Sequence, residues 1–376
     1  MRPIYLDNQA TTPVDPRVLE RMLPYFGPKF GNAASSSHAF GIEAEQAVEF
    51  ARKRVAALAG ASPREIVFTS GATESNNLAI KGGVRGGSVI TVATEHRAVL
   101  DPVKSLESLG CRTIVLPVGR DGRLDLDVLR AAIQPDTVLV SVMYANNETG
   151  VIQPVREIGA ICRDRSVIFH SDATQAFGKI PLNVETDHID LMSVSAHKIY
   201  GPKGVGALYV RRRGPRLTAQ MDGGGHEGGL RSGTLNVPGI VGFGEACSLC
   251  ASEMETESAR LAEWRDRLEA HLIAEGATVN GSREHRLPGS LNLRFHGVLA
   301  ASLLTSLSGV ALSTGSACSS AIPQPSHVLQ ALGLSTEEVL SSVRFGLGRF
   351  TTGEEMESAA GQIVQAVRKL RALTPA

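Results

Sequence analysis

Over roughly the first 240 residues, short apolar runs alternate with longer segments in which apolar residues recur at helical spacing. Five segments are nearly continuous apolar runs bounded by turn residues: 65–69, 88–92, 138–144, 167–169 and 206–210. Runs of about four to eight such residues are typical of strands buried on both faces, as in a parallel sheet. Between them, residues 42–59 carry one apolar stripe with helical spacing. This alternation predicts a doubly wound α/β domain whose ligand site lies at the carboxyl ends of its strands.

The pattern changes in the last third of the chain. Residues 251–275 predict a charged amphipathic helix. A strand-like segment 291–295, a helix near 298–308, the loop 313–325 and the segment 343–350 follow. A second amphipathic helix closes the chain. We therefore expect a smaller α+β unit, and we divide the chain into a large domain of residues 15–250 and a small domain of residues 1–14 and 251–376.

Charge and composition narrow the class of protein. The 376 residues contain 38 Lys and Arg against 38 Asp and Glu, so the formal charge is zero. This balance gives no electrostatic reason to expect a direct nucleic-acid or membrane partner. No apolar run approaches the roughly 20 residues of a membrane helix, and the first residues lack a secretory pattern. We expect a soluble, cytoplasmic protein.

Two polar features follow predicted strands. Strand 65–69 breaks at Ser70-Gly71, and the next helix opens with Ala72-Thr73. Free amide N–H groups, a glycine and the Thr73 hydroxyl can hold a phosphate group there, although the same residues also make an ordinary helix cap. Asp172 directly follows the strand 167–170, where α/β sheets bind ligands. It too can serve only as a helix cap.

Lys198 follows the apolar run 189–194, lies beside His197 and precedes the rigid turn 199–204. Most lysines are solvated surface residues, but a lysine in small, partly apolar surroundings can act as an amine nucleophile. A lysine, a carboxylate and a phosphate seat in one α/β domain together favour pyridoxal 5'-phosphate as cofactor. This cofactor needs a Schiff-base lysine, an acid beside its pyridine nitrogen and neutral donors around its phosphate.

The five cysteines are an odd number, and their scatter does not resemble a disulfide framework. Cys318 lies among Gly, Ser, Ala and Thr in the loop 313–325, which keeps a thiol accessible, as reactive cysteines require. The other four favour structural interpretations and no metal site. Cys111 and Cys162 read as small hydrophobes, while Cys247 and Cys250 form one CxxC without a partner pair for zinc.

Several blocks of the sequence resemble the NifS/IscS-type cysteine desulfurases of the class V aminotransferase family. The resemblance extends from residues 5–13 to residues 344–352, and its blocks are TSGATESNN, TEHRAVL, NNETG, DATQAFGK, SAHKIYGPKG, LRSGT and TGSACSS. It implies the fold-type I, aspartate aminotransferase-like architecture. It also implies a pyridoxal 5'-phosphate enzyme that acts as a homodimer.

The resemblance assigns a role to each matching residue. Lys198 would hold the cofactor covalently, Asp172 would pair with its pyridine nitrogen, and His96 would stack on its ring and move protons. Cys318 would be the nucleophile. The remaining roles fall to Ala72, Thr73, Ser195, His197 and the second subunit's Thr234 at the phosphate, to Gln175 and Asn147 near the phenolic oxygen and the substrate, and to Arg344 and Asn32 at the substrate carboxylate.

The implied reaction converts L-cysteine to L-alanine and leaves a persulfide on Cys318. The sulfur would then pass to an acceptor protein, such as an iron–sulfur scaffold or another carrier for cofactor synthesis or nucleic-acid thiolation. A selenocysteine lyase, or another enzyme of the class V family, is the alternative that shares Lys198 and Asp172. A non-enzymatic nucleotide-binding or scaffold protein on the same sheet is a further alternative.

The chain departs from the family pattern in three places. Gly228 follows Glu227 where the family usually has Arg, and Ala33 follows Asn32 where Pro is frequent. Only Thr-Pro-Ala follows Leu373, whereas housekeeping members carry a longer tail that docks the iron–sulfur scaffold. The acceptor of the sulfur is therefore left open.

Overall fold

The large domain is built around a seven-stranded sheet in the computed structural model, which describes residues 2–315 and 325–373. Within the described chain, β8 alone runs antiparallel to its neighbours β2 and β7, and the other joins are parallel. This arrangement confirms the predicted α/β class. The strands, in spatial order, are β2 (Ile66–Thr69), β8 (Gly206–Val210), β7 (Leu191–Ser195), β6 (Ile168–Asp172), β5 (Thr137–Ser141), β3 (Ser88–Val92) and β4 (Arg112–Leu116).

Successive residues of a strand point to opposite faces of the sheet, and here both sets are apolar. Each face is therefore covered by a hydrophobic core. Ile90 and Val140 pack in one core, whereas Val89 and Leu139 pack in another on the opposite face. The first core also contains side chains of α2 (Ala39–Ala59), α5 (Leu126–Ala132), α6 (Val155–Asp164) and α1 (Pro16–Met22). The second contains side chains of α3 (Ala72–Gly83) and α4 (Arg97–Ser105).

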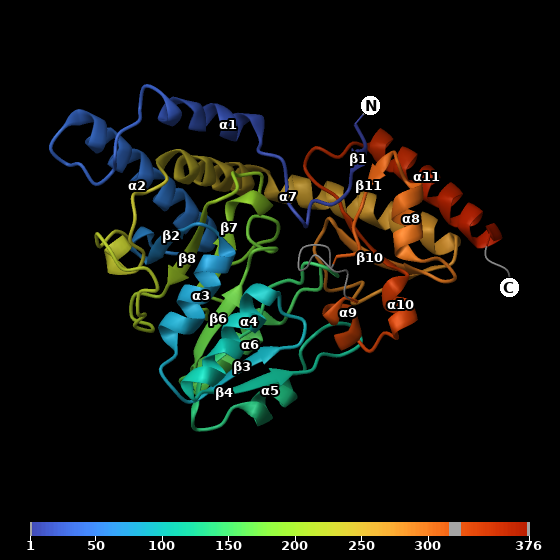
Figure 1. The fold of residues 1–376 in the computed structure, drawn as a ribbon, viewed down its shortest axis with the longest axis horizontal. Coiled ribbons are helices and arrows are strands. Elements are labelled where there is room, and N and C mark those ends of the chain that lie inside the picture. The colour runs from blue at the N-terminus through green and yellow to red at the C-terminus, as the bar shows by residue number, and fades with distance from the viewer. Residues whose placement is uncertain (1, 316–324, 374–376) are drawn as a thin grey trace.

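Helix α7 (Val237–Ala274) connects the two parts of the molecule (Figure 1). Its N-terminal half packs in the large core through Phe243, and its C-terminal half packs in a second core through Leu268. The sequence predicted the helix only from residue 251. The proposed domain boundary after residue 250 therefore falls inside a continuous helix, and the division into domains stays a prediction.

The second core surrounds a small antiparallel sheet of β12 (Ser342–Gly346), β10 (Ser290–Phe295) and β9 (Ala277–Val279). Beside it, β1 (Ile4–Tyr5) pairs in parallel with β11 (Val310–Ala311). The helices of this part are α8 (Ala300–Ser306), α9 (His327–Ala331), α10 (Thr336–Leu340) and α11 (Gly353–Leu373). None of the helices within residues 2–315 and 325–373 combines the length and apolar character needed to cross a membrane.

The N-terminal segment passes from the small sheet to the large one. Asp7 pairs with Gly346 at the end of β12. A few residues later, the backbone N–H and the hydroxyl of Thr12 both donate to the carbonyl of His197, at 3.1 and 2.9 Å. Residues 7–12 therefore lie across the carboxyl end of β7, where the sequence places the candidate lysine.

Candidate active site

A cavity of about 540 Å³ opens at the carboxyl ends of the parallel strands. Its wall gathers residues that are far apart in the sequence, which is where ligands bind in open α/β sheets. Most of the predicted site residues line it, namely Ala72, Thr73, His96, Asn147, Asp172, Gln175, Ser195, His197, Lys198 and Arg344. The structure thus brings together the phosphate seat, the carboxylate and the lysine that the sequence singled out.

Lys198 ends a short 3-10 turn, Ala196–Lys198, directly after β7. Its Nζ donates to the backbone carbonyls of Gln9 and Ala10, at 2.8 Å in the second case. The amine therefore lies between the large sheet and the N-terminal segment, at the wall of the cavity. This is the position that a covalent attachment to a ligand in the cavity requires.

Asp172 is the last residue of β6, and both of its carboxylate oxygens accept hydrogen bonds. Asn76 Nδ2 donates to Oδ2 at 2.7 Å, and the backbone N–H of Thr174 donates to Oδ1 at 3.0 Å. The side chain is fixed in direction as it faces the cavity, so it can pair with a protonated nitrogen there. The sequence did not single out Asn76, although it lies one helical turn after Thr73.

His96 is the N-cap of α4, and its Nδ1 accepts a hydrogen bond from the Ala98 N–H at 3.1 Å. Because Nδ1 is the acceptor, the neutral ring carries its proton on Nε2. Burial lowers the pKa of His96; the charge of Asp172 opposes this, and that of Lys198 adds to it. This environment therefore favours the neutral imidazole at the wall of the cavity.

Two buried acids beside the site went unnoticed in the sequence. Burial, reinforced by the charge of Asp172, raises the pKa of Glu95 well above its usual value. Burial also raises the pKa of Glu148, whose carboxyl accepts a hydrogen bond from the Ser326 hydroxyl. Both lie next to predicted residues in the same motifs, but their burial depends on contacts that adjacency in sequence does not reveal.

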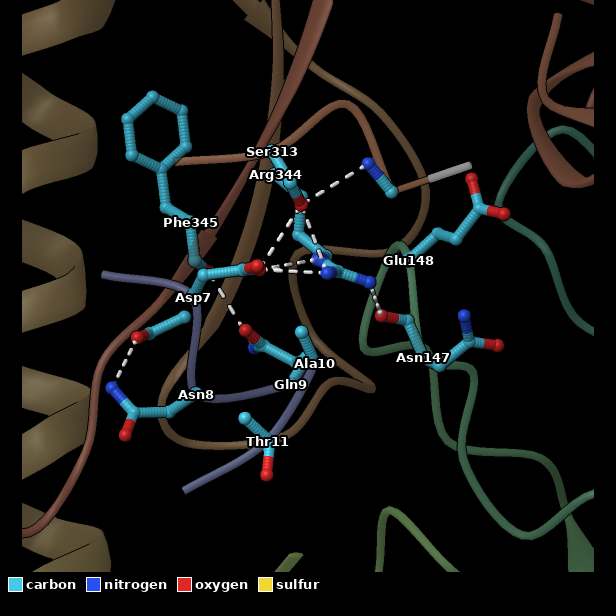
Figure 2. A network of polar contacts seen from close by, with 12 residues as sticks. Asp7, Asn8, Gln9, Ala10, Thr11, Asn147, Glu148, Ser313, Arg344 and Phe345 are labelled. Atoms are coloured by element: carbon cyan, nitrogen blue, oxygen red, sulfur yellow. Dashed lines mark hydrogen bonds and ion pairs between the residues drawn. The ribbon is translucent and has the colours of Figure 1, made fainter. Parts of the chain in front are cut away.

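Arg344 is 2% exposed and is held from three sides (Figure 2). Its Nη2 donates to Asp7 at 2.6 Å and to Ser313 at 2.9 Å, and its Nη1 donates to the Asn147 carbonyl at 3.1 Å. The Nε–H also points to Asp7, at 3.2 Å. The guanidinium is therefore fixed in plane at the cavity wall, and within the described chain these contacts leave one of its five N–H donors for a ligand.

The start of α3 fits a phosphate group. Its N-cap is Gly71, with φ of +150°, and none of the described side chains caps the helix. Its first amide N–H groups therefore face the cavity without an acceptor from those side chains. Ser195 and His197 lie nearby on the same wall. Burial, together with the charges of Lys198, Lys203 and Lys179, lowers the pKa of His197 to about 4.

Unpartnered buried polar atoms also indicate a ligand. Thr174 Oγ1 and Asn147 Oδ1 are buried and have no hydrogen-bond partner within the described chain, and both residues line the cavity. Such atoms are costly unless something pairs with them. With the lysine, the carboxylate and the open helix N-terminus, these residues fit a phosphorylated pyridine aldehyde such as pyridoxal 5'-phosphate.

Three predicted residues are not part of this wall. Asn32 is exposed and accepts a hydrogen bond from the Ala34 N–H at 3.0 Å, and Thr234 is exposed as well. Cys318 lies outside the described residues. Of its described neighbours, Ser326 donates to Glu148, and a Cβ added at Gly315 would lie 3.0 Å from the same carboxyl group.

The other cysteines are buried as expected. Cys111 and Cys162 pack in apolar cores, which confirms their interpretation as small hydrophobes. Cys247 and Cys250 also pack in the core of the large domain.

Comparison with known proteins assigns the family. A model of the aminotransferase class-V family matches residues 4–358, and the chain belongs to this family. It is similar to the cysteine desulfurase IscS of Anaeromyxobacter dehalogenans (strain 2CP-C), with 57% identity over 381 residues that cover 99% of this chain and 94% of the relative. The resemblance and the fold class predicted from the sequence are therefore confirmed.

Solved structures agree with this assignment. A NifS-like protein is 38% identical, with a TM-score of 0.92, covering 98% of this chain and 100% of that one. A structure of SspA in complex with cysteine is 37% identical, with a TM-score of 0.82, covering 93% of this chain and 100% of that one.

Proposed function

We propose that this chain is a cysteine desulfurase, which uses pyridoxal 5'-phosphate to convert L-cysteine to L-alanine and leaves a persulfide on Cys318. The observation that carries the proposal is the single cavity around which Lys198, Asp172 and the open N-terminus of α3 converge. Membership of the class-V aminotransferase family and the 57% identical desulfurase support it.

Different residues around the cavity would bind different parts of the cofactor. Lys198 would bind it covalently, Asp172 would pair with its pyridine nitrogen, and Gln175 and Asn147 would bind near its phenolic oxygen. Ala72, Thr73, Ser195 and His197 would hold its phosphate at the start of α3. When bound, the cofactor supplies an electron sink that stabilises negative charge at the substrate Cα.

Proton transfer belongs to Lys198 and His96. With the cofactor and cysteine bound, the Lys198 amine would be the base that takes the proton from the substrate Cα. His96 exchanges its proton only at Nε2, because Nδ1 is occupied by the Ala98 N–H. The lowered pKa favours the neutral ring, whose Nε2–H then faces the cavity as a proton donor and takes a proton back at the same nitrogen after it has given one up.

Arg344 binds the substrate carboxylate. Asp7 and Ser313 orient its guanidinium, so little side-chain freedom is lost when a carboxylate binds. The family pattern also assigns Asn32 to this carboxylate, although Asn32 is exposed outside the wall of the cavity that contains Arg344. The thiolate of Cys318 then attacks the substrate sulfur, forming the S–S bond of the persulfide as the Cβ–S bond breaks.

The active unit is a homodimer in the cytoplasm, and the sulfur passes to an acceptor protein, either an iron–sulfur scaffold or another carrier. Large apolar side chains that are exposed on residues 19–50 support the dimer. The exposure of Thr234, away from the cavity of its own chain, is what a contribution to the neighbouring subunit's phosphate site requires.

The test separates the cofactor from the thiol. With pyridoxal 5'-phosphate and L-cysteine supplied, Cys318→Ala is expected to keep the visible absorbance of the bound cofactor and to lose persulfide, measured by mass spectrometry after alkylation. Lys198→Ala is expected to lose the absorbance itself. Cys111→Ala, which removes a buried thiol, is the matched control and should retain both.

Persulfide formed by Cys318→Ala at the wild-type rate would refute the role of this thiol. Selenide release from selenocysteine without any sulfur release from cysteine would instead identify a selenocysteine lyase. A wild-type chain that binds no pyridoxal 5'-phosphate would overturn the proposed function as a whole.

A further inference from the structure

A smaller cavity shares Gln9 with the main cavity. Its wall includes Lys179, Tyr200, Glu257 and Ser258, contributed by the loop after β6, the turn after Lys198 and helix α7. The Ser258 hydroxyl donates to the Lys179 carbonyl at 2.8 Å and ties that loop to the helix. Lys179 belongs to the DATQAFGK block but has no role in the function described so far.

A chain of hydrogen bonds connects Lys179 with Lys198. Lys179 Nζ donates to Gln175 Oε1 at 2.9 Å, and Gln175 Nε2 donates to the Gln9 carbonyl, also at 2.9 Å. The same Gln9 carbonyl accepts the hydrogen bond of Lys198 Nζ. One amide side chain and one backbone carbonyl therefore separate the two lysine amines.

The contact with Lys179 fixes which end of the Gln175 amide faces the active site. With Oε1 turned to the lysine, the amide nitrogen points to the Gln9 carbonyl beside Lys198. The flipped amide would bring its oxygen against that carbonyl and its nitrogen against a cationic amine, so both contacts would be lost. The lysine and the carbonyl thus select the same orientation.

Lys179 also lacks a close counter-ion. Across residues 2–315 and 325–373, no carboxylate oxygen lies within 4.0 Å of its amine, and the nearby Glu257 carboxylate is taken up by Arg349 at 2.7 Å. Burial lowers the pKa of Lys179 to about 7, and the charges of Lys198 and Arg344 add to this. Glu257 and Cys250, both on α7, act in the opposite direction.

We propose that Lys179 is a positioning residue of the active site, which holds the Gln175 amide with its nitrogen toward Lys198 and places a positive charge behind that lysine. The proposal rests on the proposed function for its consequence in the loaded enzyme, but its electrostatic part concerns the chain alone. Coupling between two charges is reciprocal, so a charge on Lys179 disfavours a proton on the Lys198 nitrogen as much as the reverse.

The experiment compares the wild type with Lys179→Met and Lys179→Arg. Methionine keeps an unbranched stem but removes the charge and the donor, whereas arginine keeps a donor and a permanent positive charge. In the holoenzyme, the absorbance of pyridoxal 5'-phosphate on Lys198 is titrated with pH. We expect the midpoint to rise in the order Lys179→Arg, wild type, Lys179→Met, with about half a pH unit or more between the two variants.

The apoprotein gives a second readout that needs no cofactor. An amine-reactive acylating reagent modifies Lys198, and peptide mass spectrometry measures the extent of modification at each pH. The pH of half-maximal acylation should rise in the same order. Circular dichroism confirms that each variant is folded, and if Lys179→Met does not fold, the lower midpoint of Lys179→Arg still tests the proposal.

Equal midpoints in all folded proteins, in both assays, would overturn the role of Lys179 while leaving the desulfurase assignment intact. If the wild type shows no cofactor absorbance, the proposed function fails instead. The acylation order of the apoproteins then still decides whether the two lysines are coupled.

Discussion

At the scale of single residues, His96 serves both the backbone and the site. Its Nδ1 satisfies one of the free N–H groups at the start of α4, which fixes the tautomer and leaves Nε2–H for the cavity. The structural and the chemical roles use different nitrogens of the ring. They can therefore be separated by a substitution that keeps only one of them.

His96→Asn is expected to preserve the helix cap and to lose the proton transfer, because asparagine caps helices well but has no group that titrates near neutral pH. His96→Ala should lose both. We expect both variants to form alanine about 100-fold or more slowly than the wild type, whereas only the alanine variant loses about 1 kcal/mol in the free energy of unfolding. Alanine release and urea denaturation measure the two effects.

An asparagine variant that retains the wild-type rate of alanine formation would remove His96 from the chemistry. A loss of stability equal to that of His96→Ala would remove the capping role, because asparagine keeps a side-chain acceptor at this position.

The sequence identified polar residues that stand out beside apolar strands. It missed residues whose role depends on a partner that is distant in the sequence. Lys198 and Asp172 were predicted because each directly follows an apolar strand. Asn76 holds Asp172 from 96 positions away, and Lys179 acts through Gln175 on a carbonyl 166 positions from that glutamine. Such pairs become visible only when the fold has brought them together.

At the scale of elements, the strands were predicted better than the long helix. The predicted strands 88–92 and 206–210 coincide with β3 and β8, because continuous apolar runs between turn residues leave little choice. The N-terminal half of α7 was missed because its glycines count against a helix. Gly244 is needed there, since a Cβ at this position would lie 2.6 Å from the Ala51 Cα on α2.

Two helical glycines therefore give opposite predictions for the same substitution. Gly244→Ala should lower the free energy of unfolding by about 1–3 kcal/mol, because the added methyl group forces α7 away from α2. Gly361→Ala, inside α11 with no atom of residues 2–315 and 325–373 within 4 Å of an added Cβ, should raise it by about 0.5–1 kcal/mol. Urea denaturation of the two apoproteins measures both values. Equal effects of the two changes would contradict the close approach of α7 to α2.

At the scale of the whole molecule, the N-terminal segment joins the two parts of the site. Asp7 holds Arg344 on the small sheet, and two residues later the Gln9 carbonyl accepts from Lys198 on the large one. The arginine assigned to the substrate carboxylate and the lysine assigned to the cofactor are thus positioned by one short stretch of chain. A change in the angle between the two parts would alter both contacts at once.

The proposed homodimer would complete the site with Thr234 of the second chain. Apolar side chains exposed on residues 19–50 gather on α1, α2 and the segment between them, at one end of the molecule (Figure 1). They are Leu19, Leu23, Phe26, Phe30, Phe40, Ile42 and Phe50. The sequence alone did not reveal this surface, because an apolar residue in a helix or loop is normally assigned to the core.

Phe30→Asp is expected to convert the proposed dimer to a monomer and to weaken the binding of pyridoxal 5'-phosphate, because Thr234 would then no longer reach the phosphate site of the neighbouring subunit. Phe30 is 69% exposed and packs against Phe40, with ring centroids 5.3 Å apart. Leu109→Asp is the matched control, since Leu109 is 73% exposed but lies outside residues 19–50. Sedimentation velocity measures the mass, and absorbance titration measures the cofactor affinity.

A Phe30→Asp protein that stays dimeric would show that these apolar side chains do not hold the two chains together. A monomeric wild type with full cofactor affinity would remove Thr234 from the phosphate site.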